Sequence, residues 1–254
     1  MPPILRPARA TASASYWRAS REPRYSITFA LPLFLLYEGL AAALSGPRGA
    51  GVRNGADVIL KGLVAAVVGP NGPLVVSAAI VLVGTFLVAR DLRRSREPLR
   101  LSIFGGMLAE AALLAALFGV VIGFATMRVL HPLTTLAITQ GAVGMDAPTR
   151  LMISLGAGLY EELLFRVILV GALVMGGRVV LGLGSRGANA FAVIVGALVF
   201  SAFHYIGPYG DPFGLESFTF RALSGLAFSA LYVTRGFGIT AWTHALYDVF
   251  LLVL

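Results

Sequence analysis

Two adjacent glutamates and an arginine lie within an apolar stretch, in the run Gly158-Leu-Tyr-Glu161-Glu162-Leu-Leu-Phe-Arg166. A charged side chain at the centre of a bilayer costs roughly 2.5–3.5 kcal/mol on insertion scales. Charged groups in such a stretch therefore line a wet cavity, pair with one another or take part in chemistry. Glu162 and Arg166 are four residues apart and share a helical face, with the glutamate first. We interpret them as a structural ion pair.

Glu161 is rotated by about 100° from Glu162 on an α-helix, so it is left without that cationic partner. We expect its carboxylate to point into a cavity, where it is suited to act as a general base. The competing interpretation is a charge cluster that only holds helices together.

Two histidines follow, each one helical turn from another notable residue. Phe200 and His204 are four residues apart, and so are His244 and Asp248. A lone histidine such as His204 is more often a hydrogen-bonded structural residue than a functional one. The pair of His244 and Asp248 favours a functional role more strongly. Asp248 can orient the imidazole of His244, or both side chains can face a substrate.

The composition predicts a membrane protein. The chain has 254 residues, of which 57% are hydrophobic and 13% charged, whereas soluble domains are about one quarter charged. The net charge of +8 is attributed to arginines at the membrane–water boundary. No basic run is interleaved with aromatic residues, so nucleic acid is not an expected partner. The absence of cysteine excludes disulfides and thiolate chemistry.

Apolar runs near the roughly 20 residues needed to cross a bilayer mark the spans. We predict an all-α, polytopic transmembrane helical bundle with seven or eight spans. The seven clear runs are 26–44, 73–89, 101–127, 149–175, 188–206, 217–234 and 237–254. The shorter segments 56–69 and 131–145 are ambiguous, and we expect the first to be an interfacial or re-entrant helix if it does not cross.

Basic stretches set the orientation. With seven spans, the arm 1–25, the loop 90–100, the connection 176–187 and Arg235 all fall on the cytoplasmic side. We interpret 1–25 as a basic cytoplasmic arm before an uncleaved first span. Straight helices in this topology would place His204 and His244 at different depths, so the two histidines can meet only if the helices tilt.

Along the chain, the sequence contains three motifs in this order: Glu-Glu-x-x-x-Arg, Phe-x-x-x-His and His-x-x-x-Asp. Together they resemble the CPBP family, which contains the CAAX prenyl proteases of the Rce1 type and bacteriocin-processing enzymes. The resemblance covers 149–254, a CPBP-like catalytic membrane core, and leaves 26–148 as N-terminal membrane helices. It implies an intramembrane endopeptidase in which Glu161 and His204 activate a water molecule.

The same resemblance assigns His244 and Asp248 to stabilisation of the oxyanion, with Phe200 as a supporting residue. The family often has asparagine where this chain has Asp248. An amide N–H can donate to an oxyanion, whereas an ionised carboxylate would repel it. We therefore expect Asp248 to orient His244, which leaves the histidine as the main donor.

Two mechanisms are open for the water. We favour a metal-free mechanism without a cofactor. The alternative is zinc held by Glu161, His204 and His244, a two-histidine, one-glutamate set that suits catalytic zinc. The chain has no His-Glu-x-x-His motif.

We expect a protein or peptide substrate at the bilayer of a bacterial inner membrane, and the oligomeric state is left open. Maturation of a secreted peptide or trimming of a C-terminal sorting tail is expected there rather than cleavage of prenylated tails. One alternative is a proton-coupled membrane transporter, which would show two repeated halves with broken helices. Another is a non-catalytic immunity or scaffold protein on the same fold.

Overall fold

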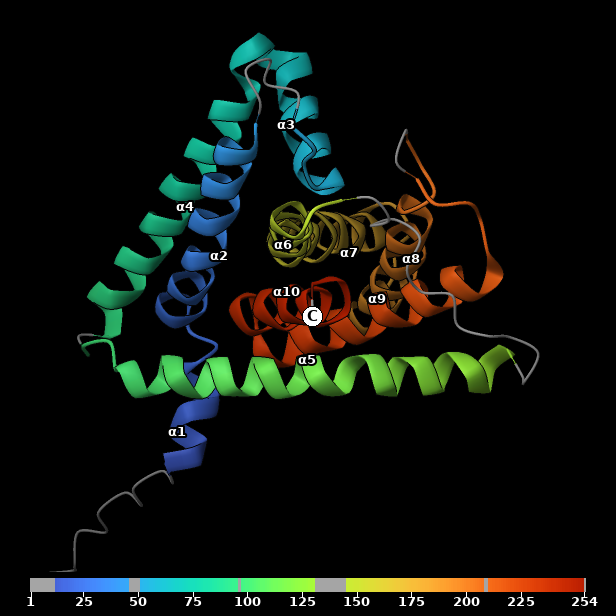
Figure 1. Cartoon of the computed structure of the whole chain (residues 1–254). Coiled ribbons are helices and arrows are strands. Elements are labelled where there is room, and N and C mark those ends of the chain that lie inside the picture. The colour runs from blue at the N-terminus through green and yellow to red at the C-terminus, as the bar shows by residue number, and fades with distance from the viewer. Residues whose placement is uncertain (1–11, 46–50, 96, 131–144, 208–209, 254) are drawn as a thin grey trace, which may run out of the picture.

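The computed structural model describes residues 12–45, 51–95, 97–130, 145–207 and 210–253, and their regular structure is entirely helical (Figure 1). The predicted all-α class is confirmed. The ambiguous segment 131–145 lies outside the described residues except for its last position. The elements are α1 (Ala12–Ala19), α2 (Pro23–Leu44), α3 (Gly55–Val68), the 3₁₀ turn η1 (Gly69–Asn71), α4 (Gly72–Ser95), α5 (Leu101–Leu130), α6 (Ala147–Gly156), the π-helix η2 (Ala157–Leu169), α7 (Val170–Val179), α8 (Ser185–Phe203), α9 (Leu215–Arg235) and α10 (Phe237–Leu252).

The segment predicted at 56–69 forms a helix of its own, α3. Asn54 caps its N-terminus, because its side chain accepts a hydrogen bond from the backbone N–H of Ala56. Gly69 ends the helix with φ +79°, a left-handed conformation that favours glycine. After η1 the chain turns back as α4, which packs against both α3 and α2 (Figure 1). The hairpin thereby points the start of α3 toward α6.

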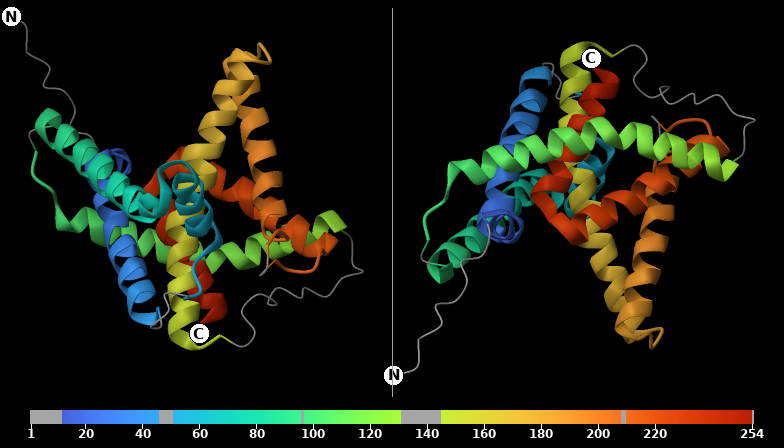
Figure 2. Two further views of the ribbon diagram at one scale, coloured as in Figure 1. Left: turned by 90° about the horizontal axis from the view of Figure 1, so that it is seen from above. Right: turned by 90° about the horizontal axis from the view of Figure 1, so that it is seen from below.

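The second half of the chain forms a continuous rod with a helix beside it. Figure 2 shows α6, η2 and α7 running end to end, with α8 folding back along α7. Asp146 begins this rod by capping α6, accepting a hydrogen bond from the backbone N–H of Thr149 at 3.0 Å. Helix α10 packs against α2, α5, α6, η2 and α9, so it lies at the centre of the bundle.

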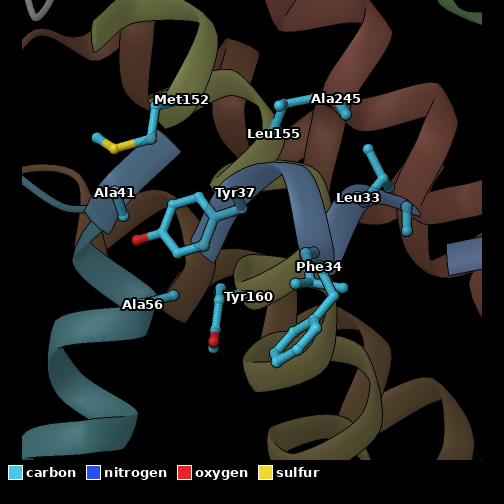
Figure 3. Packing of buried hydrophobic residues seen from close by; sticks show 11 residues of the cluster. Leu33, Phe34, Tyr37, Ala41, Ala56, Met152, Leu155, Tyr160 and Ala245 are labelled. Carbon is cyan, nitrogen blue, oxygen red and sulfur yellow. The ribbon is translucent and has the colours of Figure 1, made fainter. Parts of the chain in front are cut away.

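The core around the rod is built by residues from five elements. Figure 3 shows Tyr37 and Leu33 of α2 packed beside Tyr160 of η2 and Ala245 of α10. Small residues allow this close approach. A Cβ on Gly158 would lie 2.3 Å from the carbonyl oxygen of Ala241, so η2 and α10 touch at a position where only glycine fits.

Four helical stretches among the described residues are long and apolar enough to cross a membrane: Pro23–Leu44, Gly55–Ser95, Leu101–Leu130 and Ser185–Phe203. They coincide with four of the seven predicted spans, although α8 ends at Phe203 and not at 206. The chain is a multi-pass membrane protein. Of the other three predicted spans, 149–175 lies on α6, η2 and α7 and carries Glu161, Glu162 and Arg166. Span 217–234 lies on α9, which carries Arg221, and 237–254 contains α10, which has 16 residues. The helices cross at steep angles, with α5 lying across the ends of α2 and α4 (Figure 1).

Three of the four basic stretches adjoin one another. Arg24 is buried and pairs with Glu22, with Asp91 at 3.8 Å and with Glu97 at 4.0 Å, which joins the N-terminal arm to the connection before α5. Arg235 donates to Ser20 at 2.9 Å and so joins the same arm to the end of α9. The side of the membrane on which they lie stays a prediction.

Arg235 also forms a buried cluster with Glu110 of α5. Its guanidinium contacts both carboxylate oxygens, at 2.5 and 2.7 Å, and stacks on the Trp17 ring with the guanidinium carbon 3.7 Å from the ring centre. The Tyr16 hydroxyl donates to the same carboxylate at 2.6 Å. Burial and this hydrogen bond raise the pKa of Tyr16, so the phenol keeps its proton and its role as donor. The cluster fastens α1 to α5 and α9.

Candidate active site

The double glutamate lies on a π-helix, which the sequence analysis did not foresee. Residues Ala157–Leu169 form η2, in which hydrogen bonds span five residues rather than four. A π-helical turn contains more residues than an α-helical turn. The angle between two consecutive side chains about the helix axis is therefore smaller than on an α-helix. This helps both Glu161 and Glu162 point into the protein, where they are 6% and 0% exposed. π-Helical turns occur frequently at functional sites.

The two carboxylate oxygens of Glu161 have different surroundings. Oε1 accepts a hydrogen bond from the side-chain amide of Asn54 at 2.9 Å. Oε2 is buried without a hydrogen-bond partner among the described residues. It lies 4.0 Å from Nε2 of His204. This separation is too long for a direct hydrogen bond, and it leaves room for an atom that contacts both groups.

His204 ends α8 as its C-cap residue, and its ring is fixed from one side. Its Nδ1 lies 2.9 Å from the carbonyl oxygen of Phe200. Because a carbonyl only accepts, Nδ1 carries the proton, and in the neutral ring Nε2 is the free acceptor. This acceptor is the atom that faces Glu161. The side chain is 25% exposed.

Glu162 pairs with two groups rather than one. Its Oε2 lies 3.2 Å from Nε of Arg166, the ion pair predicted from the four-residue spacing. Its Oε1 lies 2.7 Å from Nδ1 of His244, which therefore donates to it. The last helix of the chain is thus tied directly to the π-helix. Sequence spacing gave no indication of this second contact.

Asp248 lies further from His244 than an orienting partner would. Its Oδ2 is 3.8 Å from Nε2 of the imidazole, outside hydrogen-bond range. The imidazole is held instead by Glu162 and by stacking on Phe228, with ring centres 4.3 Å apart. The 3.8 Å between Asp248 and Nε2 of His244 is similar to the 4.0 Å between Glu161 and Nε2 of His204.

Phe200 connects the two histidines. Its ring centre lies 5.0 Å from that of His204 and 6.3 Å from that of His244. The guanidinium of Arg166 lies over the same ring, with its central carbon 4.4 Å from the ring centre. The two histidines therefore share an aromatic neighbour, in spite of the depth difference expected from straight helices.

The geometry also bears on the zinc alternative. Among the described residues, no group of three His, Asp or Glu side chains is arranged to hold a metal ion. Nδ1 of His204 and Nδ1 of His244 are both engaged by protein acceptors. Their Nε2 atoms stay free, as in histidines that ligate a metal, so the metal-free mechanism stays a prediction, and we derive no step through a metal.

Asn54 was missed by the sequence analysis. It is 3% exposed and lies in the connection before α3, 107 residues away from the glutamate that it contacts. The signal in the sequence was an N-cap, since asparagine before Gly55-Ala-Asp57 is a favoured start for a helix. A cap predicts local structure only, so it could not indicate the contact with Glu161.

Comparison with known proteins assigns the C-terminal part of the chain. Residues 144–250 match the family model described as type II CAAX prenyl endopeptidase Rce1-like. This is the family that the three motifs resemble, and the match supports a general function as an intramembrane endopeptidase. The searches of curated proteins and of solved structures gave no match.

Proposed function

We propose that the protein hydrolyses a peptide bond of a membrane-associated protein or peptide, using a water molecule activated by Glu161 and His204. The observation that carries this proposal is the 4.0 Å separation between Oε2 of Glu161 and Nε2 of His204. A water molecule placed about 2.8 Å from each atom would hydrogen-bond to both. Both atoms are acceptors, so they bind the two water hydrogens and leave an oxygen lone pair for attack.

The chemistry balances with these two groups. Glu161 accepts a proton as the water oxygen bonds to the scissile carbonyl carbon, and the carbonyl oxygen becomes an oxyanion. When the carbon–nitrogen bond breaks, this proton passes to the leaving nitrogen. The second water proton follows it, so the products are a carboxylate and an ammonium group. His204 holds the water in place throughout. A general base of this kind contributes typically 10²–10⁴-fold to the rate.

His244 is the proposed donor to the oxyanion. Its Nδ1–H donates to Glu162, which fixes the ring. Nε2 can donate to the oxyanion only in the doubly protonated imidazolium, a form that the carboxylates of Glu162 and Asp248 beside the ring favour. Asp248 lies beside that nitrogen, at 3.8 Å. A carboxylate next to an oxyanion is unfavourable unless it is protonated, so the role proposed for Asp248 is to support the proton on His244 rather than to donate itself.

The reaction is proposed to take place without a metal ion, at the inner membrane of a bacterium. The substrate class is an exported or membrane-bound polypeptide, either a peptide precursor or a protein with a C-terminal sorting tail. The transporter and the non-catalytic protein remain the rival hypotheses, and both predict that no peptide bond is cleaved.

The test uses full-length protein reconstituted in lipid vesicles. It is incubated with membrane proteins from a strain that lacks the gene, and new N-termini are labelled and identified by mass spectrometry. We expect cleavage sites that are absent with Glu161→Ala and with His204→Ala, and retained with Glu216→Ala, a glutamate of α9 outside the site. Full cleavage by the first two variants, or no cleavage by the wild type, contradicts the proposal.

A further inference from the structure

The described residues outside 144–250 contribute one side chain directly to the candidate site, that of Asn54. We propose that Asn54 is a positioning residue that holds the Glu161 carboxylate so that its free oxygen faces His204. This inference rests on the proposed function, because it gives Asn54 a role in the same water-activating pair. It also assigns part of the active site to the N-terminal helices.

The orientation of the Asn54 amide is fixed at both ends. Its Oδ1 accepts from the backbone N–H of Ala56 at 2.9 Å, and its Nδ2 donates to Oε1 of Glu161 at 2.9 Å. The reverse orientation would place an oxygen against the carboxylate and an N–H₂ group against an N–H. Only one assignment of the amide therefore satisfies both neighbours.

The backbone that carries Asn54 is held as well. Its N–H donates to the Tyr37 hydroxyl at 3.2 Å, and Tyr37, which is fully buried, donates in turn to Asp57 at 2.8 Å. Gly156 lies against this segment, since a Cβ there would be 2.8 Å from Cβ of Asn54 and 2.5 Å from the Tyr37 ring. The close approach of α3 to the rod therefore depends on a glycine at the end of α6.

The Asn54 amide is the hydrogen-bond partner that the structure gives to Glu161. Oε2 has none among the described residues, so the single contact at Oε1 decides how the carboxyl plane is turned. The next residue, Gly55, packs under the ring of Phe203, where a Cβ would lie 3.1 Å from the ring. Phe203 precedes His204, so the start of α3 contacts Glu161 directly and the residue next to His204.

Loss of the amide would leave Oε1 buried without a donor and the carboxylate free to turn away from His204. A displacement of about 1 Å in a catalytic group can lower the rate by 10²-fold. Binding of a polypeptide elsewhere in the site does not depend on this oxygen. Loss of the Asn54 amide should therefore lower kcat and leave KM unchanged.

The test uses full-length protein and a quenched fluorescent peptide built around a cleavage site mapped as described above. Asn54→Ser keeps an oxygen that can cap α3 but is too short to reach Glu161. Asn54→Asp keeps the size and the cap but replaces the donor with a carboxylate that repels Glu161. Asp146→Ala is the matched control, because it removes the cap of α6 without touching the site. Thermal unfolding is measured on all three.

We expect Asn54→Ser and Asn54→Asp to lower kcat about 10–100-fold with KM unchanged, while Asp146→Ala keeps wild-type kcat. In a Glu161→Gln background, adding Asn54→Ser should change kcat no further, since coupled residues are not additive. A merely structural role predicts additive losses and a lowered unfolding temperature.

The outcomes separate this inference from the proposed function. If Glu161→Ala is inactive and both Asn54 variants keep wild-type kcat, the positioning role is wrong and the proposed function stands. Additive losses of kcat in the double variant Glu161→Gln with Asn54→Ser also contradict the positioning role. If Glu161→Ala cleaves the peptide at the wild-type rate, the proposed function itself fails.

Discussion

Nδ1 of His244 lies 2.7 Å from Oε1 of Glu162, so the second of the two adjacent glutamates holds a histidine from the last helix of the chain. The same carboxylate lies 3.2 Å from Nε of Arg166. One buried anion thus joins the structural ion pair to the proposed oxyanion site. The two glutamates have separate roles, with Glu161 facing the water position and Glu162 fixing the ring.

Replacement of Glu162 should affect folding and catalysis together. Glu162→Gln leaves Arg166 as a buried cation without its partner, and breaking a buried pair in this way costs about 3–5 kcal/mol. We expect a lower unfolding temperature in detergent and a reduced kcat. The double variant Glu162→Gln with Arg166→Gln should recover part of the stability but not the activity. Recovery of activity would show that Glu162 does not position His244.

Replacement of Asp248 by asparagine tests its place beside His244. An amide can donate to an oxyanion, whereas a carboxylate would repel it. Because the Asp248 carboxylate is proposed to support the proton on His244, we expect Asp248→Asn to lower kcat, by up to about 10²–10³-fold if the oxyanion contact is lost entirely. Wild-type kcat in this variant would mean that the carboxylate is not required.

Gly158 should tolerate no side chain. A Cβ there would lie 2.3 Å from the carbonyl oxygen of Ala241 and 2.6 Å from Cβ of Ala245. Gly158→Ala should push α10 away from η2, separate His244 from Glu162 and lower kcat about 10²-fold. The matched control is Gly171→Ala in α7, where a Cβ meets nothing within 4 Å. Equal activity of the two variants would argue against the close contact.

Glu110 should matter for stability and not for chemistry. Glu110→Gln leaves the guanidinium of Arg235, which is 2% exposed, without its carboxylate. We expect a loss of about 3–5 kcal/mol, with kcat of the folded protein unchanged. The control Glu22→Gln removes a partly exposed partner of Arg24, which keeps Asp91, and should cost under about 1 kcal/mol. Equal unfolding temperatures of the two variants would contradict this ranking.

Removal of metal ions tests whether the proposed hydrolysis proceeds without a metal. If Glu161 and His204 activate the water alone, dialysis against a strong chelator should leave kcat unchanged, and added zinc should not raise it. Activity on the quenched fluorescent peptide is the measurement, with a known zinc peptidase as the control. Loss of activity on dialysis and its return with zinc would favour a metal-dependent mechanism.

The sequence by itself determined the local features. Residues four apart on a helix share a face, so the pairs Glu162 with Arg166 and Phe200 with His204 could be predicted and are in contact. The apolar runs defined the helices, because a span must satisfy its own backbone. The π-helix was not predicted, since the sequence pattern was interpreted with the α-helical period.

Only the tertiary structure decided which distant groups meet. Asn54 and Glu161 are 107 residues apart, and Glu162 and His244 are 82 apart. Both contacts depend on the crossing of helices and on glycines at Gly156 and Gly158 that allow backbones to approach. Spacing along one helix contains no information about such crossings, which is why Asp248 was expected to orient His244 and why the structure places Glu162 there instead.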